Sequence, residues 1–153
     1  LPLSTPRETQ LWQHIHAEIG HVSAETALSG SGLPRLYRAI CAVDGHEPRL
    51  HTPEAITAAG LAGDPIALEV LEQFCCWLGR VAGNNVLTTG ARGGVYIVGG
   101  VIPRFADFFL ESGFARCFAD KGCMSEYFQG IPVWLVTAPY PGLVGAGVAL
   151  EQA

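Results

Sequence analysis

Residues 94–104 read GVYIVGGVIPR, a short apolar run that leads into a glycine pair and then into Pro103. Short, bounded apolar runs are typical of strands in a buried parallel sheet. Glycine at the end of such a strand lets backbone approach a ligand with no Cβ in the way. The stretch therefore predicts a strand over 94–98 that ends at a candidate ligand-binding turn, Gly99 and Gly100. On spacing alone, a plain tight turn from strand to helix is the simpler interpretation.

A second run of the same kind, IPVWLV at residues 131–136, predicts a second strand. The region between the two runs is helical in pattern and rich in phenylalanine, which predicts one β–α–β crossover and a parallel pair. A two-stranded sheet is not independently stable. We therefore expect the remaining strands to come from residues outside this chain, which would make it part of a larger α/β protein.

Helix-start signals precede these strands. Thr5-Pro6-Arg7-Glu8 offers an N-cap hydroxyl, a proline in the first turn and a capping-box glutamate. Thr52-Pro53 and Asp64-Pro65 repeat the cap-then-proline pattern, and the apolar positions after Asp64 predict a long helix over roughly residues 65–88 that ends at Gly90. Shorter helices are expected from Ser23 and over residues 34–43. The fold class is thus α/β, helix-rich with a partial parallel sheet.

Composition excludes several classes of function. The chain has 153 residues, of which 49% are hydrophobic and 15% charged, with a net charge of −5. The absence of a basic cluster argues against a nucleic-acid partner. No apolar run reaches the ~18 residues of a membrane span, and the first residues do not resemble a secretion signal.

The histidines and cysteines do not suggest a metal site. The cysteine count is five, which is odd, and no C-x-x-C spacing occurs. We interpret the cysteines as reduced thiols of a cytoplasmic protein. His14 and His16 point to different faces of one helix and lack a matching Cys or Asp, so no metal-binding residue is predicted.

Residues 17–25, AEIGHVSAE, contain the other candidate site residue. Ser23 is a suitable N-cap, which places Glu25 in the first helical turn, where the helix dipole favours a carboxylate. On pattern alone this is the favoured interpretation. The functional alternative is that Glu25 accepts hydrogen bonds from two hydroxyls of a polyol.

At these stretches the chain resembles the bacterial glucokinases of the sugar kinase, actin and Hsp70 superfamily. The resembling segments are residues 17–25, 28–33, 94–104, 114–122 and 141–147, and they occur in the family's order over nearly the whole chain. The resemblance implies the carboxyl-terminal part of an actin-like ATPase (ribonuclease H-like) fold. It further implies residues 1–140 in the large, adenosine-side lobe and 141–153 as a connecting helix that returns to the small lobe.

The function implied by the resemblance is transfer of a phosphoryl group from ATP, with Mg²⁺, to glucose, the first step of glycolysis. In the family pattern Glu25 corresponds to a residue that contacts the hexose, and Gly99 and Gly100 to an adenosine-side motif. The family's D-x-G-G-T-N segment, its Asn-Asp pair with the general base and its G-E-G-G-H segment are not found here. We therefore expect no catalytic base in this chain, a missing amino-terminal half as partner, and no activity of the fragment alone.

Two other hypotheses stay open at this level. The chain could belong to a non-catalytic sugar-sensing or interaction module that keeps the fold without the chemistry, or it could be a small independent domain of unrelated function. The sequence leaves undecided which hexoses are accepted, whether an upstream catalytic Asp is intact, and whether the whole protein forms a homodimer.

Overall fold

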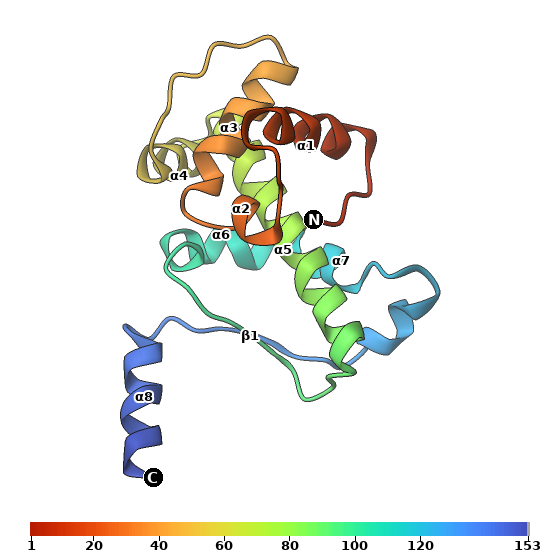
Figure 1. Cartoon of the computed structure of the whole chain (residues 1–153), viewed down its shortest axis with the longest axis vertical. Helices are drawn as coiled ribbons and strands as arrows, with labels where there is room; N and C mark the ends of the chain where they lie inside the picture. Colours follow the sequence, from red (N-terminus) through yellow and green to blue (C-terminus); the bar gives the residue numbers. More distant parts are fainter. Residues whose placement is uncertain (153) are drawn as a thin grey trace.

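The computed structural model describes residues 1–152, and Figure 1 shows how they are arranged. A cluster of helices surrounds the long central helix, a small sheet lies at one end of the cluster, and the last helix stands apart from the rest (Figure 1). The order of elements in the described residues is α1 (Pro6–Ile19), α2 (Ala24–Ala27), α3 (Gly32–Val43), α4 (Pro53–Leu61), α5 (Pro65–Thr89), β1 (Val95–Ile97), η1 (Ile102–Phe105), α6 (Ala106–Glu111), α7 (Phe114–Ala119), η2 (Gly122–Phe128), β2 (Val133–Leu135) and α8 (Pro141–Glu151).

The predicted helix starts are confirmed. Thr5 caps α1 and forms the full capping box with Glu8. The side chains of Thr52 and Asp64 each accept a backbone N–H in the first turn of α4 and α5. Helix α5 ends at Gly90, whose φ of 66° is the left-handed conformation that favours glycine.

Helix α5 forms the centre of the core. Phe74 and Trp77 on α5 are fully buried, as are Leu11 of α1 and Ile40 of α3. Four of the five cysteines are also buried, which agrees with their interpretation as core residues, whereas Cys123 is exposed.

Two glycines of α5 let α7 pack directly on its backbone. A Cβ on Gly79 would lie 2.4 Å from the carbonyl oxygen of Phe114, and one on Gly83 would lie 2.4 Å from that of Phe118. Any larger residue would push the helices apart. This close contact places the crossover between the two strands firmly against α5.

The two strands pair in parallel, as predicted, with Val95 opposite Val133 and Ile97 opposite Leu135. They are shorter than expected, three residues each. These four side chains pack against the helical core. On the other face Tyr96 and Trp134 stack with ring centroids 4.7 Å apart and stay 66% and 42% exposed. The expected burial on both faces is therefore not found in residues 1–152, because no described element covers this face.

Helix α8 begins where predicted but buries none of its described residues. Leu143 and Leu150 are 74% and 80% exposed. None of the described helices combines the length and the apolar character needed to cross a bilayer. An apolar helix of this length is marginal alone in water, so its surface fits contact with another polypeptide.

Candidate functional site

A pocket of about 420 Å³ lies where both strands end. Since β1 and β2 are parallel, the turn after each one emerges at the same edge of the sheet. The first turn contributes Val98, Gly99, Gly100 and Pro103 to the lining, and the second contributes residues 136–141. The structure thus places both predicted adenosine-side glycines on one pocket.

The two glycines are there for different reasons. Gly99 has φ 150°, a conformation that residues with a Cβ rarely adopt. Gly100 has no such φ, and a Cβ on it would meet no atom within 4 Å. A tight turn therefore explains Gly99 but not Gly100. The described residues therefore leave room for a larger side chain at Gly100, which lines the edge of the pocket.

The lining is mostly apolar. Thr137 and Tyr140 add hydroxyl groups, and none of the lining residues carries a formal charge at neutral pH. Pockets of ~300–1,000 Å³ with a few polar groups are typical small-molecule sites. This chemistry fits a planar heterocycle better than a polyphosphate, which would need cations or a row of backbone amides.

The turn after β1 is held by the helical core. Phe105 at the end of η1 is buried and meets the Phe74 ring edge to face at 6.3 Å. Arg104 forms an ion pair with Glu54 of α4. The Glu54 carboxyl accepts a hydrogen bond from its own backbone amide, and the Arg104 guanidinium adds a second one. Together they hold the pKa of the Glu54 carboxyl below its ordinary value, with the backbone bond as the larger cause. The glycine turn is therefore tied to two helices.

Glu25 lies on α2, in the first helical turn, as predicted. The cap itself is made by Ser23, whose hydroxyl accepts the Thr26 amide at 3.0 Å. Glu25 is exposed, and no hydrogen bond or ion pair joins it to another of residues 1–152. The carboxylate is thus free to bind a ligand. It does not line the pocket of Gly99 and Gly100, so the two predicted sites are separate surfaces of this chain.

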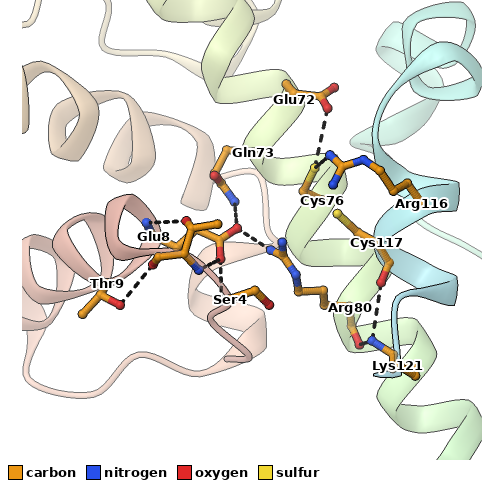
Figure 2. A network of polar contacts seen from close by, with 11 residues as sticks. Ser4, Glu8, Thr9, Glu72, Gln73, Cys76, Arg80, Arg116, Cys117 and Lys121 are labelled. Atoms are coloured by element: carbon orange, nitrogen blue, oxygen red, sulfur yellow. Dashed lines mark hydrogen bonds and ion pairs between the residues drawn. The ribbon is translucent and has the colours of Figure 1, made fainter. Parts of the chain in front are cut away.

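A buried ion pair joins α1 to α5, and Figure 2 shows its surroundings. Glu8 and Arg80 are only 3% and 6% exposed, and their side chains pair directly. Gln73 donates to the same carboxylate at 2.9 Å, and the Ser4 amide donates at 2.7 Å (Figure 2). This network lies away from the glycine pocket and has a structural role.

The sequence interpretation missed Arg80 altogether and gave Glu8 only its capping role. An arginine in the middle of the apolar pattern of α5 was the available signal, because a buried cation needs a nearby anion.

No metal centre emerges from the described residues. Residues 1–152 contain no group of three or more His, Cys, Asp or Glu side chains that could hold an ion. His14, His16 and His21 are exposed, and the His16 ring stacks on Trp12 at 4.7 Å.

Tyr140 is a site residue that the sequence interpretation did not identify. It lines the pocket together with Gly99 and Gly100. Its position between Pro139 and Pro141 was the available signal, since two prolines restrict the backbone around it.

The comparisons with known proteins agree on one family. The family model described as Glucokinase matches residues 1–153. A glucokinase of Pseudomonas aeruginosa (strain PAO1) is 55% identical over 154 residues, which is 100% of this chain and 46% of that protein. A glucokinase of Chromobacterium violaceum is 52% identical over 147 residues, which is 95% of this chain and 42% of that protein.

The fold comparison gives the same result. A crystal structure of glucokinase from an Antarctic psychrotroph superimposes with a TM-score of 0.91 at 38% identity, covering 100% of this chain and 48% of that one. This match confirms the predicted fold class, a helix-rich part of an actin-like ATPase fold with a small parallel sheet. The chain spans slightly less than half the length of these relatives. The family model matches the whole length of the chain, and the two glucokinases named above are 55% and 52% identical to it in sequence. The chain therefore belongs to the glucokinase family.

Proposed function

We propose that the full-length protein transfers the γ-phosphoryl group of ATP to O6 of glucose, and that this chain binds the adenosine and part of the sugar. The observation that carries the proposal is the pocket at the ends of β1 and β2, where Gly100 leaves open space without needing to be glycine for the fold. It occurs in a chain of the glucokinase family.

The two surfaces would bind different substrates. The apolar pocket suits the adenine ring, and the free carboxylate of Glu25 suits two sugar hydroxyls. Phosphoryl transfer depends mainly on positioning and on stabilising charge. This chain would supply positioning, while the general base and the groups that hold the β- and γ-phosphates would come from the rest of the protein.

The described residues contain no group of three or more His, Cys, Asp or Glu side chains that could hold an ion. The Mg²⁺ of the proposed reaction would be bound by the nucleotide phosphates and by residues outside this chain. We therefore assign none of this chain's side chains to the ion.

The exposure of the last helix supports a two-lobed protein. We propose that residues 1–140 belong to the adenosine-side lobe and that 141–153 connect it to the other lobe. Helix α8 has an apolar surface without partners among residues 1–152, which fits contact with that second lobe. Five free cysteines support a reducing, cytoplasmic location.

We expect Glu25→Gln in the full-length protein to raise the KM for glucose about tenfold or more. Losing a hydrogen bond to a charged group typically costs about 1.5–3 kcal/mol. The thermal midpoint should barely change, because Ser23 and not Glu25 makes the cap. Steady-state kinetics and a melting curve measure both. Ser23→Ala is the matched control, with a lower midpoint and a nearly normal glucose KM. An unchanged glucose KM together with a lowered melting point in Glu25→Gln would assign Glu25 to the helix alone.

We expect Gly100→Val to weaken ATP binding while glucose binding stays close to normal. The Cβ has room in the fold but extends into the space that the adenosine would occupy. Titration with each substrate separately gives the two dissociation constants. Loss of both affinities to the same extent would mean that the glycine serves the fold only.

The proposed reaction is tested on the full-length protein with glucose and Mg-ATP, by following ADP release in a coupled assay. Turnover that depends on both substrates supports the kinase. Glucose binding without any turnover would instead support the sugar-sensing module.

A further inference from the structure

Tyr140 has an unusual backbone conformation. Its φ and ψ are 52° and 47°, and it is the only residue other than glycine with positive φ among residues 1–152. A bulky residue in this region is uncommon because its Cβ crowds the backbone. Pro141 makes the conformation more unusual, since a residue before proline is driven toward extended geometry. Strain of this kind concentrates at functional sites.

The side chain of Tyr140 lies at the edge of the pocket and is open to solvent. It is 79% exposed and lines the pocket with Gly99 and Gly100. Tyr140 is the one aromatic side chain in that lining, as far as the described residues go. A large ring without cover, at the edge of an apolar pocket, has a free π-face to offer a ligand.

We propose that Tyr140 is a specificity-determining residue whose ring stacks on the purine base of the nucleotide. This inference rests on the proposed function, which places adenosine in the pocket. The glycines let the base approach the backbone on the β1 side, and Tyr140 adds an aromatic side chain to the lining from the β2 side. Stacking is stronger for the larger purine than for a pyrimidine, so the residue would favour ATP over CTP.

The test distinguishes the effect of the Tyr140 ring from the effect of its backbone conformation. In the full-length protein, Tyr140→Asn removes the ring but keeps a residue that tolerates positive φ, and Tyr140→Phe keeps the ring. We expect Tyr140→Asn to raise the KM for ATP about tenfold, the scale of one base–aromatic stacking contact. Its thermal midpoint should be unchanged or slightly higher, and its glucose KM normal. Tyr140→Phe, which removes only the hydroxyl, should raise the KM for ATP much less than Tyr140→Asn does.

The preference between nucleotides is the second readout. We expect the ratio of kcat/KM for ATP to that for CTP to fall about tenfold in Tyr140→Asn and to stay unchanged in Tyr140→Phe. A normal ATP KM and a normal ratio in Tyr140→Asn would overturn the inference and leave Tyr140 a backbone role only. An equal loss for ATP and CTP would overturn it as well. If the unmodified protein binds ATP but phosphorylates no glucose, the proposed function fails. Isothermal titration of ATP against the same variants then still tests the stacking contact.

Discussion

The 153-residue chain by itself should phosphorylate glucose at least a thousandfold more slowly than the full-length protein. General-base catalysis alone contributes about 10²–10⁴-fold, and the base must lie within ~2.6–3.2 Å of the hydroxyl proton. The Asn-Asp segment that supplies this base in the family pattern is not found in this sequence. Nothing among the residues that line the pocket of Gly99 and Gly100 would hold the β- and γ-phosphates either, and losing such electrostatic groups removes further orders of magnitude.

A coupled assay on the purified chain with glucose and Mg-ATP measures this directly. The full-length protein at the same concentration is the positive control, and mixing in the separately produced amino-terminal half should restore part of the rate. Turnover of the isolated chain clearly above background would show that a catalytic base is present after all.

The second large effect concerns stability. Arg80→Met in the full-length protein should lower the free energy of unfolding by about 3–5 kcal/mol, because it leaves the buried Glu8 carboxylate without its partner. The matched control is Arg38→Met, which breaks the ion pair with Glu18 at a site where both side chains are more than one third exposed. Exposed pairs are worth about 0–1 kcal/mol. Urea unfolding curves of both variants make the comparison, and similar losses in the two would contradict the buried role.

The pH dependence provides an independent check on the same pair. Burial alone would raise the pKa of the Glu8 carboxyl, but hydrogen bonds to the Ser4 amide and to the side chains around it hold that pKa below its ordinary value. A lowered folded-state pKa means that this stabilisation is present at neutral pH and is lost as pH falls through the folded pKa. Glu8→Gln should therefore flatten the loss of stability in acid. An unchanged acid profile would mean that the charge of Glu8 does not contribute.

Local sequence signals were sufficient for most of the secondary structure. The caps at Thr5, Thr52 and Asp64 depend on side chains and backbone amides within three residues, so the pattern alone predicted where α1, α4 and α5 begin. The strand ends were less well predicted. Pairing in a sheet depends on neighbours, and β1 and β2 have only each other in the described residues.

The candidate site was likewise predicted in part by the sequence and in part only by the structure. The sequence pointed to Gly99 and Gly100 because glycine after a parallel strand has a local meaning, and it pointed to Glu25 through the family resemblance. Only the structure showed that Gly100 lacks a backbone reason to be glycine. It also showed that Glu25 is not needed for the cap of its own helix.

What the sequence determined by itself is mainly what acts over a few residues: helix starts and stops, the two strands and the glycine turn between strand and helix. The parallel order of the strands was inferred from the helical crossover between them. The tertiary structure decided the contacts between residues far apart in the chain. Glu8 and Arg80 are 72 positions apart, and Tyr140 lines one pocket with the glycine turn because two parallel strands end at one edge. Such contacts depend on how whole helices and strands pack against one another. No residue spacing within a single helix or strand encodes them.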